Sequence, residues 1–195
     1  MSLILFYDTE TTGFPKKGRP LEEQPYVVQL AAEVWDEESC QVVHQLNVVF
    51  NWDVDIPKEA SDVHGWPTTL TKRVGTSTGN ALEFFIDLQE MCSLRVGHNE
   101  QFDAQLVEIA LQRTCAFNLP LWKNRPAFCT MEAMRDVCKL PPTSKMKAAG
   151  FNNYKSPKLI EAYRHAFGED FDGAHNAMAD VQACRKVWLW LQKQN

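Results

Sequence analysis

The spacing of apolar positions predicts strands in the first part of the chain. Residues 3–7 form a continuous apolar and aromatic run, which is typical of a central strand covered on both faces. A loop rich in Pro, Gly and Lys follows over residues 14–25. Residues 26–35 and 41–50 then have strand-like composition and are separated by the turn-like segment 36–39. Because the connections are short, these three strands are expected to pair as an antiparallel meander.

The pattern changes to helical spacing after Pro57. Asn80 is expected to cap a helix whose apolar residues recur every three or four positions. Residues 94–97 are expected to form a short strand that leads into another helix at about Asn99, and a further short strand is expected just before Thr130. The remaining helices are expected near residues 130–139, 156–167 and 175–193. This order of elements predicts an α/β fold with a mixed sheet.

Length and composition favour one domain over residues 1–195. Of the 195 residues, 45% are hydrophobic and 11% are aromatic, which is enough for one substantial core. The apolar N-terminal run lacks the flanking features of a secretion signal, and no stretch approaches the ~20 apolar residues of a membrane span. We therefore expect a soluble, cytoplasmic protein without a membrane partner. The six cysteines include no C-x-x-C pair, so reduced thiols are expected rather than disulfides or a zinc site.

Two acidic residues lie at the end of the first predicted strand. Asp8 and Glu10 are two positions apart, so in extended backbone both side chains point to the same face. Two converging carboxylates repel each other and lose hydration unless a cation or protons intervene. A turn or helix-capping role is the alternative for this pair.

Asp103 and Asp180 occupy similarly unusual positions on predicted helices. The apolar stripe of its helix includes Phe102, Leu106 and Ala110, and the last two are three and seven positions after Asp103, so this acid lies at the edge of an apolar face. Asp180 lies about 60° from the apolar stripe of the last helix, at roughly 100° per residue. Either acid alone fits a boundary position or an ion pair. Four acids with the same anomaly favour a shared function.

A divalent cation is the natural partner for such a group of acids. Mg²⁺ and Mn²⁺ prefer oxygen ligands and leave room for water and substrate phosphate. Two such ions about 4 Å apart can stabilise both the attacking and the leaving oxygen of a displacement at phosphorus. His175 stands at the start of the helix that carries Asp180, and an imidazole with a pKa near 6.5 can accept a proton from water. A capping or surface role is the alternative for this histidine.

The charge distribution bears on whether the partner is a nucleic acid. A net charge of −5 argues against a protein that holds nucleic acid through a globally positive surface. If four carboxylates bind metal, however, the rest of the chain carries a charge of only about −1. Residues 139–158, which we call the lysine-rich segment, contain five lysines and no acid. A solvated loop and a phosphate-contacting rim both fit this segment.

Three segments resemble the motifs of the DEDD, or DnaQ-like, superfamily of 3′→5′ exonucleases. FYDTETTGF (residues 6–14) is similar to the first motif, VGHNEQFD (96–103) to the second and HNAMAD (175–180) to the third. The His-x₄-Asp spacing of the third motif indicates the DEDDh branch, since the sister branch has a tyrosine four residues before the aspartate. The resemblance implies an RNase H-like fold, with a mixed five-stranded sheet whose first three strands are antiparallel and whose faces are flanked by helices. The five matching catalytic positions are Asp8, Glu10, Asp103, His175 and Asp180.

The resemblance also implies how these residues work. Asp8, Glu10 and Asp180 would share the more tightly held ion. Asp8, with a second ion oriented through Asp103, would act on the leaving group and substrate phosphate. Two Mg²⁺ ions are the expected cofactors, with Mn²⁺ able to substitute, and His175 is the expected general base. Cleavage would begin at the 3′ end and release nucleoside 5′-monophosphates.

Substrate contacts are implied near the first motif. By resemblance, the backbone at Thr11 and Thr12 anchors the terminal 3′-hydroxyl group. Phe14 is expected to stack on a base.

A second region of expected substrate contact is SDVHGW (residues 61–66), which resembles the family's His-Gly loop beside the scissile end. His64 and Trp66 are therefore candidate contacts, since stacking on an aromatic ring contributes ~1–3 kcal/mol per base. A core position is the alternative for Trp66. Asn99 is expected to form a hydrogen bond within the site, with helix capping as its alternative.

The substrate is the least determined part of this interpretation. The main hypothesis is an enzyme that acts on single-stranded or frayed nucleic-acid ends, with DNA favoured. An RNA-trimming exoribonuclease shares all three motifs, because sugar discrimination depends on the shape around the 2′ position. A non-catalytic nucleic-acid-binding or polymerase-associated subunit is expected to have lost a catalytic residue, and none is lost here. An ATPase is excluded because Gly13-x₄-Gly18 lacks the Lys-Ser/Thr of a P-loop. A polymerase or a second copy of the chain is a candidate partner.

Overall fold

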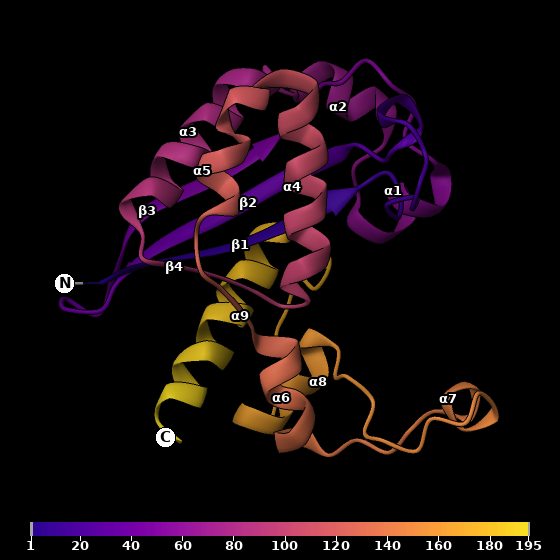
Figure 1. The fold of residues 1–195 in the computed structure, drawn as a ribbon, viewed down its shortest axis with the longest axis vertical. Coiled ribbons are helices and arrows are strands. Elements are labelled where there is room, and N and C mark those ends of the chain that lie inside the picture. The colour runs from indigo at the N-terminus through magenta and orange to yellow at the C-terminus, as the bar shows by residue number, and fades with distance from the viewer. Residues whose placement is uncertain (1, 195) are drawn as a thin grey trace.

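The strands form one mixed sheet in the computed structural model, which describes residues 2–194 (Figure 1). The order across the sheet is β3-β2-β1-β4-β5. The first three strands pair antiparallel, whereas β4 runs parallel to both β1 and β5. The fold class predicted from the sequence is confirmed. The strands are β1 (Leu3–Thr11), β2 (Val27–Asp36), β3 (Gln41–Val49), β4 (Leu94–Gly97) and β5 (Ala127–Cys129).

Helices lie between the strands and after the last one. The predicted capping role of Asn80 is wrong, because the buried Thr78 already belongs to the first turn and Ser77 takes the position before the helix. The first helices are α1 (Lys58–His64), α2 (Thr68–Val74), α3 (Thr78–Met91), α4 (Glu100–Thr114) and α5 (Leu119–Lys123). After β5 come α6 (Thr130–Cys138), α7 (Ser144–Ala148), α8 (Leu159–Phe167) and α9 (Ala177–Gln192), and short 3₁₀ turns occupy Leu21–Glu23 and Ala116–Asn118.

The central strand β1 divides the core into two layers. Leu5 and Tyr7 face a cluster that buries the apolar sides of α3, α4 and α5, while Ile4 and Phe6 face α9. Phe6 packs edge-to-face on Trp188 of α9, with ring centroids 5.5 Å apart. The strand is therefore apolar at every position between residues 3 and 7, because both of its faces are covered. In Figure 1, α4 crosses in front of the sheet and α9 lies behind it.

β1 continues beyond the predicted run and is paired there on one side only. Its pairing with β4 ends at Phe6 and Val96, whereas β2 accompanies it to Thr11. Glu10 lies opposite Gln29 of β2. The far end of β1 is consequently open on the β4 side, and helix termini can approach it from that side.

A smaller cluster joins α6, α8 and α9 below the sheet. Met134, Tyr163 and Val187 are buried at its centre. The lysine-rich segment connects α6 to α8 and carries α7 away from the body of the molecule (Figure 1). Within residues 2–194, no helix combines the length and apolar character needed to cross a membrane.

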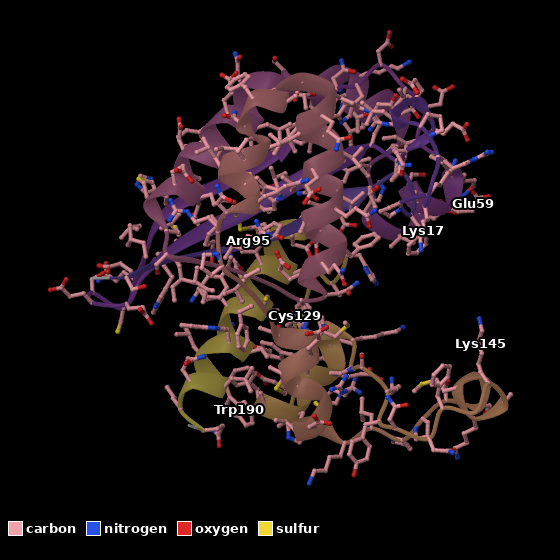
Figure 2. All side chains as sticks on the ribbon, viewed as in Figure 1. Lys17, Glu59, Arg95, Cys129, Lys145 and Trp190 are labelled. Atoms are coloured by element: carbon pink, nitrogen blue, oxygen red, sulfur yellow. The ribbon has the colours of Figure 1, made fainter. Side chains whose placement is uncertain are left out.

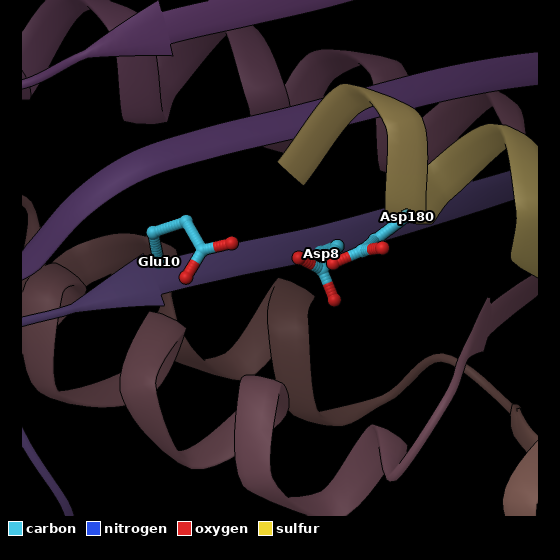
Figure 3. Close-up of side chains that lie close together, drawn as sticks. All are labelled: Asp8, Glu10 and Asp180. Atoms are coloured by element: carbon cyan, nitrogen blue, oxygen red, sulfur yellow. The ribbon is translucent and has the colours of Figure 1, made fainter. Parts of the chain in front are cut away.

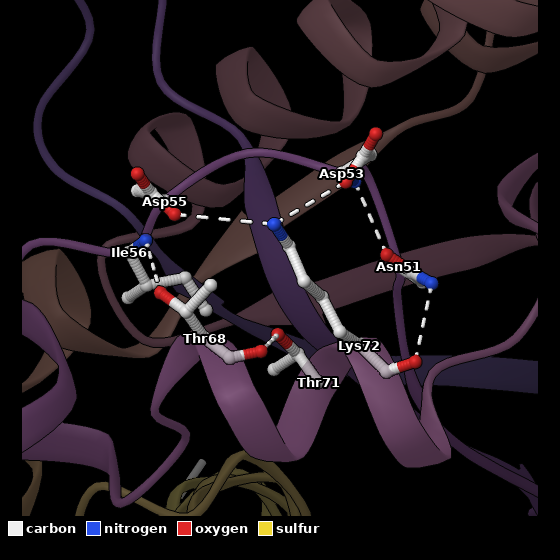
Figure 4. Close-up of polar contacts among 7 residues, drawn as sticks. All are labelled: Asn51, Asp53, Asp55, Ile56, Thr68, Thr71 and Lys72. Atoms are coloured by element: carbon white, nitrogen blue, oxygen red, sulfur yellow. Dashed lines mark hydrogen bonds and ion pairs between the residues drawn. The ribbon is translucent and has the colours of Figure 1, made fainter.

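The loop before α1 is fastened to α2 by polar contacts (Figure 4). The Lys72 ammonium group lies 3.3 Å from the Asp53 carboxylate and 4.0 Å from that of Asp55. The backbone N–H of Ile56 donates to Oγ1 of Thr68 at 2.8 Å. These contacts fix the chain where it enters α1, a helix that forms one wall of the pocket described below.

Candidate active site

Three carboxylates from two elements converge at the open end of β1. Asp8 and Glu10 project from the same face of the strand, as the sequence spacing predicts, and Asp180 reaches them from the first turn of α9 (Figure 3). One oxygen from each of the three residues lies within 4.8 Å of the others. We call these three residues the carboxylate cluster. Their spacing suits a shared cation.

Asp180 is held in place by the N-terminus of its helix. Asn176 caps α9, its side chain accepting a hydrogen bond from the N–H of Met178 at 3.2 Å. The backbone N–H of His175 donates to Oδ2 of Asp180 at 3.1 Å. A helix N-terminus favours negative charge, so this location partly compensates for the burial of the carboxylate.

Asp103 approaches from the opposite face of the sheet. It lies in the first turn of α4, and its Oδ1 accepts the backbone N–H of Thr9 at 3.1 Å and the Thr9 hydroxyl at 2.6 Å. The structure therefore places Asp103 beside the carboxylate cluster, tied to the residue between Asp8 and Glu10.

The first turn of α4 is anchored by a buried ionic network. Glu100 accepts hydrogen bonds from the Tyr7 hydroxyl at 2.8 Å and from Nε of Arg95 at 2.7 Å. The Arg95 guanidinium group lies 4.0 Å from the ring centroid of Trp122. Removing one partner of such a pair leaves a buried charge uncompensated, so this network fixes the position of α4 and with it that of Asp103.

Burial raises the pKa of each of the four acids, and neighbouring acids add to the shift for all of them except Asp180. Burial raises the pKa of Glu10 to about 8, with further contributions from Asp180 and Asp103. Burial raises the pKa of Asp180 to about 6 and that of Asp103 to about 7, although hydrogen bonds to both carboxylates oppose the shift. The pKa of Asp8 is well above its usual range because of burial and because of all three other acids. The site thus disfavours its own negative charge unless protons or cations neutralise it.

An apolar pocket of about 290 Å³ opens next to the carboxylate cluster. Glu10 belongs to its wall, so the pocket and the acids are continuous. Phe14 and Phe102 contact each other with ring centroids 5.7 Å apart, and Phe14 is 81% exposed. The predicted contacts Thr11, Thr12, Phe14 and His64 all line this pocket, together with Glu10, Gly13, Pro57, Glu59, Ala60, Val63 and Phe102.

His64 is buried in the pocket wall in a defined protonation state. Its Nδ1 accepts the backbone N–H of Trp66 at 3.1 Å, which places the proton of the neutral ring on Nε2. Burial lowers the pKa of the ring, so it is neutral at pH 7. The backbone of Thr11 lies near the ring and opposes part of this shift in pKa. Among the described residues, none makes a well-formed hydrogen bond with the buried Nε2.

The other two candidate contacts lie outside the pocket lining. The Trp66 indole N–H donates to Oε1 of Gln29 at 2.9 Å. Asn99 precedes α4 with a φ of 69°, and its side chain makes no capping hydrogen bond to the described helix. Phe102 is the main pocket residue that the sequence reasoning missed. The available signal was its place directly before Asp103, but its apolar character was attributed to the helix stripe.

Comparison with known proteins identifies a protein family that matches most of the chain. The family model RNase_T, described as exonuclease, matches residues 5–188. The sequence matches no curated protein in such a comparison.

Several solved structures have a similar fold. The structure of E. coli Exonuclease I in complex with a dT13 oligonucleotide superposes with a TM-score of 0.73 at 19% identity, covering 100% of this chain and 41% of that one. A product-bound structure of exonuclease I gives a TM-score of 0.70 at 19% identity, covering 98% of this chain and 43% of that one. A complex named ExoI/SSB-Ct gives a TM-score of 0.72 at 18% identity, covering 100% and 42%. The chain thus spans about two fifths of the length of these proteins, and at this identity the likeness shows a shared fold.

Proposed function

Because the chain belongs to the exonuclease family whose model spans residues 5–188, within the DnaQ-like 3′→5′ exonucleases, we propose that it hydrolyses single-stranded or frayed DNA from the 3′ end. The terminal nucleotide leaves as a nucleoside 5′-monophosphate. The observation that carries this proposal is the convergence of Asp8, Glu10 and Asp180, with one oxygen of each within 4.8 Å of the others. Buried like charges cost stability, so a function explains their presence better than packing does.

The donor atoms of the carboxylate cluster fit Mg²⁺ or Mn²⁺. All three ligands are carboxylates, and hard divalent cations prefer such oxygen ligands. Their raised pKa values show that the negatively charged forms are disfavoured, and a bound cation would stabilise those forms. Asp8 lies between Glu10 and Asp180 (Figure 3), so it would bind both ions. Glu10 and Asp180 would hold the first ion, and Asp103 would orient the second. When bound, the two ions would stabilise charge on the attacking and leaving oxygens of an in-line displacement.

His175 is the proposed general base. Its backbone N–H donates to Oδ2 of Asp180 at 3.1 Å, so the residue stands beside the cluster, and it is exposed to solvent. Its φ of 68° is uncommon for a residue with a side chain, and such conformations concentrate at functional sites. His175 accepts a proton from the water whose oxygen bonds to phosphorus, while the bond from phosphorus to the 3′ oxygen of the penultimate nucleotide breaks. That oxygen takes a proton from solvent, and the exposed imidazole returns its own proton to bulk water.

The apolar pocket is the proposed site of the terminal nucleotide. Phe14 and Phe102 offer aromatic surface to one base, while the backbone at Thr11 and Thr12 is at hand for the 3′-hydroxyl group. Because Glu10 belongs both to the pocket wall and to the carboxylate cluster, the phosphate of a nucleotide in the pocket would lie next to the ions that the cluster holds. A base that is still paired within a duplex cannot enter, which supports single-stranded or frayed ends as substrates.

DNA is proposed over RNA on the strength of a structural neighbour. E. coli Exonuclease I, whose fold this chain shares, has been solved with a dT13 oligonucleotide. The sugar preference of this chain depends on the space around the 2′ position of the terminal residue.

Digestion of matched 5′-labelled DNA and RNA oligonucleotides tests the proposal. With Mg²⁺ or Mn²⁺ we expect a ladder that shortens from the 3′ end, faster for DNA, and no cleavage in EDTA. An Asp8→Asn preparation purified in parallel controls for contaminating nucleases. Release of the label as a mononucleotide in the first turnover would contradict the direction, and cleavage that persists in EDTA would contradict the metal dependence.

A further inference from the structure

The lysine-rich segment is an ordered loop that projects from the body. The N–H of Lys155 donates to the carbonyl of Leu140 at 3.1 Å and closes its stem. At the tip, Thr143 caps α7 by accepting the N–H of Met146 at 3.2 Å, and the N–H of Phe151 returns to the carbonyl of Met146 at 2.9 Å. These bonds give the segment a defined shape, unlike a solvated tether.

The segment concentrates positive charge in an otherwise acidic protein. The whole chain carries −5, and this segment carries five lysines without an acid, so the rest of the chain carries −10. Lys155 is neutralised by Glu161, with its ammonium group 2.5 and 2.8 Å from the two carboxylate oxygens. Lys145 and Lys147 are exposed on α7, and no ion pair in the described chain includes them. Their charge is therefore available to an anion.

Aromatic rings accompany these lysines. Phe151 is 60% exposed and Tyr154 is 41% exposed. Tyr154 lines a hollow of about 470 Å³ together with Asn152, Asn153, Arg135 and Asp136. Exposed rings next to unpaired lysines are the combination that binds single-stranded nucleic acid, since phosphates pair with the cations while bases stack on the rings.

The base of the segment is tied to the active-site region. The imidazole of His98 contacts the carbonyl of Pro157, at the end of the segment, at 3.0 Å, and contacts Oγ1 of Thr130 at 2.9 Å. His98 lies between β4 and the helix that carries Asp103. The base of the segment is thus fixed next to the helix that carries Asp103. In the view of Figure 2, Lys145 projects from the same side of the molecule as Glu59, which lines the apolar pocket.

We propose that the lysine-rich segment is a second binding site for the single-stranded substrate, several nucleotides on the 5′ side of the scissile bond. Lys145 and Lys147 contact phosphates, and Phe151 and Tyr154 stack on bases. The inference rests on the proposed function, in that the strand whose 3′ end enters the apolar pocket is the strand that the segment holds. It predicts that long substrates bind more tightly than short ones.

Binding of a 5′-fluorescein-labelled oligothymidylate of about 20 nucleotides, measured by anisotropy in EDTA, tests the segment without any catalysis. Lys145→Glu with Lys147→Glu should raise Kd roughly tenfold at low salt and reduce the salt slope by about 1.4, because two phosphate contacts are lost. The matched control is Arg73→Glu with Lys193→Glu, which makes the same charge change at exposed positions on α2 and after α9. Equal Kd values and equal salt slopes for the two double variants would overturn the proposal.

The contribution of the two aromatic rings can be measured separately, through Kd at high salt. Phe151→Ala with Tyr154→Ala should raise Kd roughly fivefold or more even at high salt, where phosphate contacts are screened but stacking persists. Binding that equals wild type at high salt would remove the two rings from the proposed site.

A small substrate separates this inference from the proposed function. The p-nitrophenyl ester of thymidine 5′-monophosphate fills the apolar pocket but cannot reach the lysine-rich segment. Both double variants of the segment should hydrolyse this ester at the wild-type rate. If no variant and no wild-type protein hydrolyses any substrate while the lysine variants still lose affinity, the proposed activity fails and the binding site stands.

Discussion

The carboxylate cluster and the lysine-rich segment are both concentrations of charge, but they are built in opposite ways. The acids stand on the central strand and on a helix N-terminus, partly or fully buried, with every pKa raised. Lys145 and Lys147 stand on a projecting loop and are exposed to solvent. Positioning metal ions requires a rigid scaffold that holds like charges together at a cost. Holding a flexible polyanion requires only accessible charge and aromatic surface. We therefore expect substitutions in the cluster to change turnover and those in the segment to change affinity.

Asp8→Asn is expected to give the largest difference between the effect on turnover and the effect on DNA binding. The amide keeps the shape of the side chain but removes the charge that lies between the other acids, so cleavage of single-stranded DNA should fall by roughly 10⁴-fold. Binding of the long oligothymidylate in EDTA should change little, because the segment is intact. Turnover close to wild type would show that the cluster does not perform the chemistry.

His175→Ala distinguishes the general base from the metal ligands within the site. Loss of the general base should slow hydrolysis by roughly 10²–10⁴-fold at saturating substrate. Mg²⁺ is expected to raise the Tm of the wild type by binding to the folded protein, and it should raise the Tm of this variant equally, since His175 is not a proposed ligand. An unchanged rate would remove the residue from its proposed role, and a lost Mg²⁺ effect would reassign it to metal binding.

The sequence predicts those residues whose positions follow from periodicity and motifs, and it does not predict those located by tertiary contacts. Asp8 and Glu10 were predictable because a strand repeats every two residues and because three motifs agree. The antiparallel pairing of the first three strands was equally accessible, because their short connections predict it. Asp103 was harder, because it arrives on a helix from the opposite face and is located through Thr9, a tertiary hydrogen bond that no periodicity reveals.

The remaining features depend on contacts between distant segments. Phe102 was counted as part of a helix stripe, and only the fold shows that it meets Phe14. The ionic partner of Lys155 lies just outside the lysine-rich segment, so counting charges within the run overstated what is free. The Asn80 cap failed because a capping residue type also occurs inside a first turn.

Phe102→Ala tests whether the apolar pocket holds a base. Loss of the ring should raise KM for the p-nitrophenyl ester of thymidine 5′-monophosphate roughly fivefold or more, corresponding to ~1–3 kcal/mol of stacking. The matched control is Phe117→Ala, whose ring is 71% exposed and lies outside the pocket. Equal KM values for both variants would exclude Phe102 from the nucleotide site.

The smallest predicted effect is on stability and follows from the raised pKa of Glu10. Its pKa rises from an ordinary value of 4.5 to about 8, so the folded state retains a proton that the unfolded state has lost. Stability in EDTA should therefore fall as the pH rises from about 5 to 8, by a few degrees in Tm, and Mg²⁺ should reverse the loss. Glu10→Gln should flatten the dependence on pH and on Mg²⁺. A Tm that rises over this range in EDTA, or a Gln variant that behaves as wild type, would contradict the assignment.

The central claim, that these acids position metal ions for hydrolysis at a 3′ end, is tested most directly by crystallography with Mn²⁺ and thymidine 5′-monophosphate. Anomalous scattering should show two manganese ions about 4 Å apart, both bound to Asp8, one of them also bound to Glu10 and Asp180. The thymine should lie in the apolar pocket with its phosphate on the ions. Crystals in which the nucleotide binds while manganese is absent from Asp8 would contradict the account.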